Sequence, residues 1–138
     1  MQRSDGTVAD GPTAPPLPLD KPGMWRLPAA SRCIPKPWGR EVWWAITPHY
    51  IGKWMEVRAG HALSLQVHRR KVETLVVASG AVRFTVDDET ALRGPGDAVT
   101  LAPGTVHRIE AVEDAVIYEV STPYWDDVVR LEDRYGRG

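Results

Sequence analysis

Short runs of Val, Ile, Trp and Tyr alternate with polar positions along most of the chain, and clusters of Gly, Pro and Asp interrupt them. This pattern is typical of an all-β sandwich or barrel, and the 3.6-residue period of a helix is nearly absent. The pattern predicts strands over residues 41–47, 53–57, 62–68, 73–79, 82–86, 98–102, 107–111 and 115–121. About eight short antiparallel strands of this kind form a jelly-roll β-barrel.

One short C-terminal helix is expected after the last of these strands. Its indicators are a capping hydroxyl, a first-turn proline, two acidic residues that complement the helix dipole, and one apolar face. These residues are Thr122, Pro123, Asp126 and Asp127, and Tyr124, Val128 and Leu131.

Residues 1–28 differ from the rest of the chain in composition. They are rich in Pro, Gly, Asp, Thr and Ala, and they show no apolar period. We interpret them as a disordered N-terminal arm, although a proline-rich arm can also dock on a neighbouring subunit. Residues 29–138 are then the single folded domain.

Composition narrows the classes of protein and partner. A chain of 138 residues with 43% hydrophobic residues accommodates one domain with a core. The 17 Lys+Arg and 18 Asp+Glu give a formal net charge of -1, which provides no overall field to attract nucleic acid or a membrane surface. Cys33 is the single cysteine, and no apolar run is long enough for a membrane span or a signal peptide. We therefore expect a cytoplasmic protein whose partner is a small molecule.

Four polar residues are expected to meet inside the barrel. Gln66 and His68 point to the same face of their strand, because side chains alternate along a strand. Glu73 returns after a short turn, and His107 begins a later strand. Imidazole nitrogen and carboxylate oxygen suit zinc, iron, manganese or nickel, and the Gln66 amide oxygen is a weaker fourth ligand. The sequence therefore predicts one divalent metal ion on these four side chains.

Two stretches resemble the two motifs of the cupin family. The first comprises Gly60, Leu63, Ser64, Leu65, Gln66, His68, Glu73 and Gly80, and the second comprises Gly96, Asp97, Pro103, Gly104 and His107. The amino-acid sequence between Lys36-Pro37-Trp38-Gly39 and Tyr135-Gly136-Arg137 is similar to that of the cupin domain of type II phosphomannose isomerases. The resemblance implies a cupin fold for residues 29–138, mannose-6-phosphate isomerase-like chemistry, and a metal site made by Gln66, His68, Glu73 and His107.

Three further residues are candidates for catalysis. Glu119 has the strand parity of Ile117 and is matched, through the resemblance, to a glutamate of the isomerases, so it is the expected general base. Lys53 and Lys71 could stabilise an enolate or a carboxylate near the metal, although lysines in strands and turns are more often solvated.

Three others are candidates for binding the substrate. Arg108 and Arg130 could bind a phosphate or carboxylate through their guanidinium groups. Strand alternation favours an exposed position for Arg108, because its neighbour His107 points inward. Tyr118 faces the side opposite Glu119.

The favoured function is that of a metal-dependent enzyme with sugar-phosphate isomerase-like chemistry. The same site could serve a cupin dioxygenase, a lyase or a rearrangement enzyme. The competing class is a non-catalytic ligand-binding cupin, in which the metal is structural or absent. We also expect a homodimer, because sheet edges and several of the six tryptophans need cover.

Overall fold

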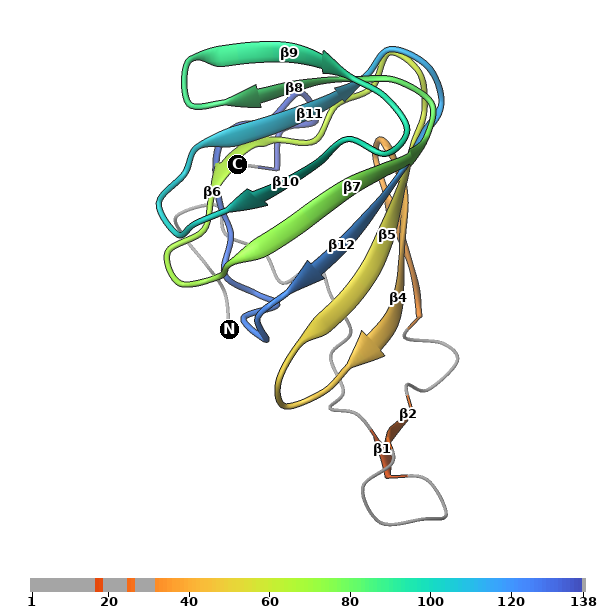
Figure 1. Cartoon of the computed structure of the whole chain (residues 1–138), viewed down its shortest axis with the longest axis vertical. Helices are drawn as coiled ribbons and strands as arrows, with labels where there is room; N and C mark the ends of the chain where they lie inside the picture. The colour runs from red at the N-terminus through yellow and green to blue at the C-terminus, as the bar shows by residue number, and fades with distance from the viewer. Residues whose placement is uncertain (1–16, 19–24, 27–31, 138) are drawn as a thin grey trace.

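The computed structural model describes residues 17–18, 25–26 and 32–137, and their regular structure is entirely β. Figure 1 shows the strands as two sheets that face each other and meet at one end of the barrel. The strands are β1 (Leu17–Pro18), β2 (Trp25–Arg26), β3 (Cys33–Lys36), β4 (Gly39–Ile46), β5 (Ile51–Val57), β6 (Leu65–Val67), β7 (Glu73–Ser79), β8 (Val82–Val86), β9 (Glu89–Arg93), β10 (Ala98–Leu101), β11 (His107–Ala111), β12 (Ala115–Ser121) and β13 (Val129–Glu132).

The main strands pair antiparallel in two sheets. One sheet has the order β10-β7-β12-β5-β4-β3, and the other has the order β13-β6-β11-β8-β9. Strands that follow each other in sequence often lie in different sheets, as β6 and β7 do, so the chain crosses repeatedly between the layers. The expected all-β jelly roll is confirmed.

The interior of the barrel has an apolar half and a polar half. Along β7 the inward positions change from Val77 and Leu75 to Glu73, and along β11 they change from Ile109 to His107. On β12 the same change leads to Glu119, which pairs with Lys53 on β5. Strand alternation puts all of these side chains inside, so the polar residues at one end cannot be explained as solvent-facing positions. This polar half contains the candidate site.

The expected C-terminal helix is wrong, because the residues meant to cap it bind a distant loop. The Thr122 hydroxyl accepts the Val72 N–H at 3.0 Å. The Asp127 carboxylate accepts three N–H groups of the loop between β6 and β7. The chain then continues as β13, which pairs with β6 and places Arg130 opposite Gln66. Local sequence favoured a helix here, and long-range strand pairing overrides it.

Two other expectations concern the ends and the surface. The arm at residues 1–28 lies outside the described residues except for the short pair β1–β2. Among the described residues no helix is long and apolar enough to cross a bilayer. The expected homodimer stays a prediction; Trp44, Tyr118 and Val120 are exposed on the outer face of the six-stranded sheet.

Candidate metal centre

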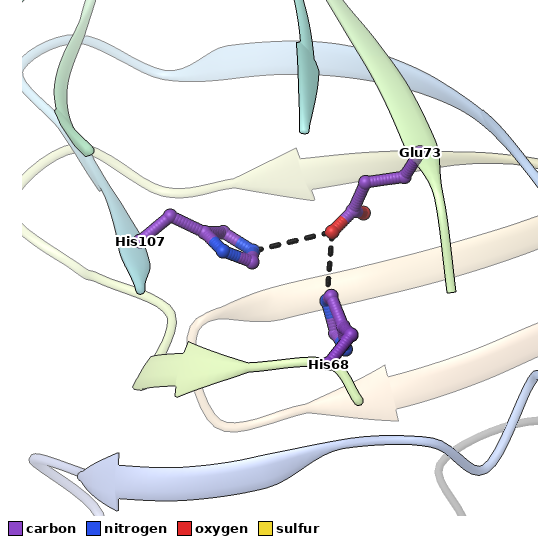
Figure 2. A group of neighbouring side chains, drawn as sticks. All are labelled: His68, Glu73 and His107. Atoms are coloured by element: carbon purple, nitrogen blue, oxygen red, sulfur yellow. Dashed lines mark ion pairs between the residues drawn. The ribbon is translucent and has the colours of Figure 1, made fainter. Parts of the chain in front are cut away.

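Three candidate ligands meet in the polar half of the barrel, each from a different strand (Figure 2). His68 follows β6, Glu73 begins β7, and His107 begins β11. The Glu73 Oε2 atom lies 2.7 Å from His68 Nε2 and 3.2 Å from His107 Nε2. All three side chains are buried, and one ligand atom from each lies within 4.8 Å of the others. Two imidazoles and one carboxylate, brought together from the two sheets, are a suitable donor set for a first-row divalent metal.

The two imidazoles already have the orientation that metal binding requires. His68 Nδ1 lies 2.6 Å from the Asp127 backbone oxygen, and His107 Nδ1 lies 3.0 Å from the Thr105 backbone oxygen. A carbonyl oxygen can only accept, so Nδ1 carries the proton in both rings and Nε2 of the neutral ring has a lone pair. Backbone partners of this kind fix the tautomer of metal-ligating histidines.

The buried contact between His68 and Glu73 therefore needs a cation between its two atoms. His68 Nε2 and Glu73 Oε2 have no hydrogen-bond partner among the described residues, although both are buried. Two lone pairs 2.7 Å apart repel each other unless a proton or a metal ion lies between them. Burial acts to raise the pKa of Glu73, but the positive charge of Lys71 is the first of the interactions that oppose it, and the pKa lies well below its usual range. An ionised Glu73 with two imidazole nitrogens fits a divalent ion.

Gln66 lies beside this group. Its Nε2 atom is 3.4 Å from His107 Nε2, and its Oε1 atom accepts the Ser64 hydroxyl at 3.0 Å. A half rotation of the amide exchanges its oxygen and nitrogen. The oxygen then faces the imidazole nitrogens, and Ser64 accepts a hydrogen bond instead of donating one. Gln66 can thus supply a fourth, neutral ligand atom.

Asp127 joins the C-terminal segment to the metal ligands. Its backbone oxygen accepts from His68, and its carboxylate accepts the N–H groups of Arg69, Arg70 and Lys71 at 3.1, 2.7 and 2.9 Å. These three residues belong to the loop that connects His68 to Glu73. One residue therefore fixes both the ring orientation of a ligand and the path of the loop that separates two ligands.

We expect Asp127→Ala to weaken metal affinity by roughly 10- to 100-fold, the range for loss of a residue that orients ligands. The change removes the three carboxylate contacts and leaves His68, Glu73 and His107 in place. Competition with a metal chelator measures the effect. Asp88→Ala, at an exposed turn, is the control and should keep the original affinity. Equal affinities for both variants would show that the loop does not need Asp127.

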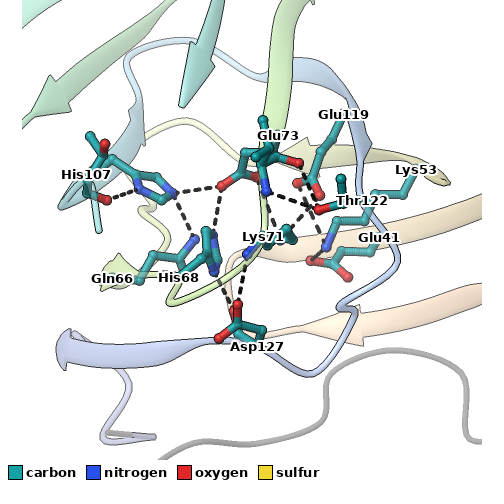
Figure 3. A network of polar contacts seen from close by, with 12 residues as sticks. Glu41, Lys53, Gln66, His68, Lys71, Glu73, His107, Glu119, Thr122 and Asp127 are labelled. Atoms are coloured by element: carbon teal, nitrogen blue, oxygen red, sulfur yellow. Dashed lines mark hydrogen bonds and ion pairs between the residues drawn. The ribbon is translucent and has the colours of Figure 1, made fainter. Parts of the chain in front are cut away.

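A row of buried, alternating charges leads away from Glu73 (Figure 3). Lys71 Nζ lies 3.7 Å from Glu73 Oε1 and 3.4 Å from Glu119 Oε2. Lys53 Nζ lies 3.9 Å from Glu119 Oε1 and 3.2 Å from Glu41 Oε2. The row thus alternates carboxylate and ammonium groups, so each buried charge has an opposite charge beside it.

The burial and the neighbours of these groups shift their pKa values in different directions. Burial raises the pKa of Glu119, and the negative charge of Glu73 adds to the increase, while Lys53 and Lys71 oppose it. Burial acts to lower the pKa of Lys53, but Glu119, Glu41 and Glu73 outweigh it and raise that pKa. Burial acts to raise the pKa of Glu41, but Lys53, Lys36 and a hydrogen bond from Trp43 hold it below the ordinary value. Lys53 is therefore an ammonium ion and Glu41 a carboxylate at neutral pH.

A small chamber adjoins the metal ligands, and cations predominate among its charged lining residues. Its volume of about 40 Å³ has room for roughly three waters, or for one end of a substrate. Gln66 and His68 form part of its wall, and Trp125 and Val128 form another part. Its charged lining residues are Lys36, Lys53, Lys71, Arg130, Arg137 and Glu41.

Burial, with a smaller contribution from neighbouring cations, lowers the pKa values of two of these groups. Burial lowers the pKa of Lys36 to about 8, and the positive charges of Lys53 and Arg137 add to the effect while Glu41 opposes it. Burial and Arg137 lower the pKa of Arg130 to about 10. Like charges held together in a partly desolvated chamber favour the binding of an anion.

The structure brings some of the expected site residues to this chamber and leaves others away from it. Lys53, Lys71 and Arg130 line it. Glu119 is buried behind the two lysines and is not among the lining residues. Two expected substrate-binding residues lie elsewhere: Arg108 donates to the Leu63 and Glu132 backbone oxygens, and Tyr118 packs against Trp54 on the outer face.

Sequence reasoning missed Glu41, Lys36 and Asp127 as site residues. A signal existed for Glu41, because it shares strand parity with Trp43 and both side chains are buried. The others reach the site from the chain ends of the domain, and no local pattern connects them with the metal ligands.

Comparisons with known proteins agree with this architecture. A family model described as the mannose-6-phosphate isomerase C-terminal domain matches residues 28–133. The chain is 34% identical over 111 residues to a mannose-1-phosphate guanylyltransferase, ManC, of Salmonella typhimurium, which covers 77% of this chain and 23% of that protein. The chain therefore spans about a quarter of the length of this relative.

Solved structures show the same fold at lower identity. KdgF from a Halomonas species aligns with a TM-score of 0.60 and 23% identity, covering 64% of this chain and 82% of its own. An RmlC-like cupin from Shewanella frigidimarina aligns with a TM-score of 0.57 and 13% identity, covering 61% of this chain and 75% of its own. At these identities the likeness concerns the fold alone.

Proposed function

The chain belongs to the family of the mannose-6-phosphate isomerase C-terminal domain, and from this membership we propose that it is a metal-dependent isomerase of a small phosphorylated sugar. A single observation carries the proposal: a cation-lined chamber adjoins a buried His–Glu–His group with metal-ready tautomers. Such a site suits a substrate that has an anionic group at one end and a carbonyl or hydroxyl oxygen at the other.

The chemistry of the proposed reaction divides between a metal ion and the charged residues of the chamber. A divalent ion held by His68, Glu73 and His107 would supply Lewis acidity. Glu41 is the ionised carboxylate that faces the chamber, so in this proposal it removes a proton from the hydroxyl-bearing carbon next to the carbonyl and returns it to the former carbonyl carbon, while the hydroxyl proton passes to the former carbonyl oxygen. Lys53 stays protonated and donates a hydrogen bond to the substrate oxygen on which negative charge develops.

Three side chains at the other part of the chamber suit the anionic group. Arg130 and Lys36 line it together with Arg137, whose guanidinium is held by Asp133 through contacts of 2.8 and 3.1 Å. An arginine fixed in this way presents its remaining donors in a defined direction. Lys71 contacts Glu73 and Glu119, so in this proposal it keeps the Glu73 carboxylate oriented rather than transferring a proton.

Isotope exchange tests the proposed reaction directly. Protein loaded separately with Zn²⁺, Fe²⁺, Mn²⁺ or Ni²⁺ is incubated with mannose 6-phosphate or fructose 6-phosphate in D₂O. We expect at least one metal to support interconversion and deuterium uptake at the carbon beside the carbonyl, and we expect a chelator to abolish both. Tight binding of the sugar phosphate without deuterium uptake would contradict the isomerase and indicate a binding protein instead.

Anion affinity is expected to fall as pH rises above about 8, the pKa of Lys36. Below that pH Lys36 is already charged, and above it the residue must take up a proton before an anion binds well. A bound anion raises the pKa of Lys36, so the loss should approach tenfold per pH unit between the free and the bound pKa. Sulfate is the probe, because its charge is constant over this range, and calorimetry measures its affinity.

Two variants separate this effect from other titrations. Lys36→Arg keeps the positive charge and should bind sulfate with a flat profile between pH 7 and pH 9. Lys36→Gln should bind weakly at all of these pH values. An unchanged pH profile in Lys36→Arg would assign the titration to another group.

A further inference from the structure

A second cavity opens between β9 and β10, away from the metal ligands. These are edge strands of the two sheets, so no ladder of backbone hydrogen bonds joins the sheets on this side of the barrel. The cavity volume is about 220 Å³, several times that of the chamber at the metal centre. Its floor is apolar and comes from β7, β8, β11 and β12: Leu75, Val77, Phe84, Ile109 and Ile117.

The sequence of β9 explains why this space is left open. Glu89, Ala91 and Arg93 pair with Val86, Phe84 and Val82 of β8, and all six side chains line the cavity. The inward positions of β9 thus carry two charged residues and one alanine, where a well-packed barrel has large apolar side chains. The inward side chains of β9 therefore fill little of the space above the floor residues, which belong to the buried core of the barrel.

The size and the rim of the cavity define the ligand that it suits. An apolar protein cavity of about 150 Å³ is large enough for benzene, so this one has room for a ring with a short chain. Two carboxylates and one guanidinium, from Glu89, Asp97 and Arg93, line its outer part. Asp97 Oδ2 accepts the Gly94 N–H, which fixes that carboxylate at the rim. Negative charge thus exceeds positive charge around an apolar floor.

We propose that this cavity is a binding site for a small apolar amine, with its ring or branched chain on the floor and its ammonium group near Glu89 and Asp97. The metal chamber has the opposite preference, because five cations and one carboxylate line it. The two sites therefore select ligands of opposite charge. This inference does not depend on the proposed isomerase reaction.

Binding of three matched probes tests the proposal. The probes are 2-phenylethylamine, 3-phenylpropionate and ethylbenzene, which share a ring and differ in head-group charge. Methyl NMR spectra of the full chain should show shifts at Leu75, Val77 and Ile109 with the amine. We expect the amine to bind about tenfold more tightly than the carboxylate, the difference that one charge-assisted contact makes.

Variants on β9 distinguish an effect on the cavity from a general effect on the strand. Ala91→Leu fills the cavity and should lower the affinity for the amine by about tenfold or more. Thr90→Leu, on the opposite face of β9, should leave that affinity unchanged. Glu89→Gln changes an exposed side chain with little risk to folding. It should lower the affinity for the amine roughly three- to tenfold and leave the affinity for ethylbenzene unchanged. Absence of methyl shifts with all three probes, equal or tighter binding of the carboxylate, or unchanged amine binding in Glu89→Gln would overturn the proposal.

Discussion

We expect His107→Ala to lose metal binding and isomerase activity together. His107 Nε2 is one of the two imidazole nitrogens that face Glu73 Oε2, and the ring is almost fully buried. Its Nδ1 proton is held by the Thr105 backbone oxygen, so the ring cannot turn to offer another atom. Alanine provides no ligand atom, and only His68 and Glu73 then remain in the group of candidate ligands formed by the described residues.

The loss of metal affinity should be roughly a thousandfold or more. Loss of a residue that only orients a ligand lowers affinity by about 10- to 100-fold, and removal of a ligand has a larger effect. Metal content by elemental analysis and turnover must be measured on the same preparation. His49→Ala is the control, because His49 lies exposed in the turn between β4 and β5. A His107→Ala protein with full metal content would show that the ion binds elsewhere.

The strands that the sequence predicted best have alternation bounded by turn residues on both sides. Four expected ranges, 73–79, 82–86, 107–111 and 115–121, are the observed bounds of β7, β8, β11 and β12. The ends of β7 and β8 are set by the same turn, because Gly80 has a φ of 80° and a Cβ there would lie 2.1 Å from the Asp114 backbone oxygen. Local patterns determine such strands completely.

The strands that were missed have local patterns that do not indicate a strand clearly. β9 has charged residues at its inward positions, β3 contains Pro35, and the short alternation of β13 overlaps the helical spacing of Tyr124, Val128 and Leu131. Each forms because a partner strand is already present: β8 for β9, β4 for β3 and β6 for β13. Pairing over long sequence distances supplies this information, and a local window does not contain it.

The same distinction applies to the candidate site. His68, Glu73 and His107 could be predicted, because strand parity and motif resemblance both indicate an inward group of metal ligands. Lys36 could not, since β3 reaches the chamber only through its pairing with β4. Glu119 was expected as the general base from strand parity and from the resemblance. Parity gives the side of a strand and not the depth, and the buried Glu119 carboxylate contacts Lys53 and Lys71 and does not line the chamber.

This difference in depth leads to a comparison of two carboxylates. We expect Glu41→Gln to keep the metal and to lose roughly a hundredfold or more in turnover, because Gln keeps the size of Glu and has no basicity. Glu41 lines the chamber, and its low pKa keeps it ionised. The amide can still accept the hydrogen bond from Trp43, which is 3.0 Å in length, so the side chain should keep its position.

Glu119→Gln is the matched control, because it removes one carboxylate from beside the same lysine, Lys53. If loss of charge around Lys53 were the whole effect, both variants would lose turnover equally. We expect Glu119→Gln instead to lower the free energy of unfolding by about 3 kcal/mol, the range for breaking a buried ion pair, and to keep most of the turnover per bound metal. Thermal unfolding, metal content and deuterium exchange on both variants measure this difference. The opposite ranking, with turnover lost in Glu119→Gln and kept in Glu41→Gln, would assign the proton transfer to Glu119 and require Lys53 and Lys71 to move aside for the substrate.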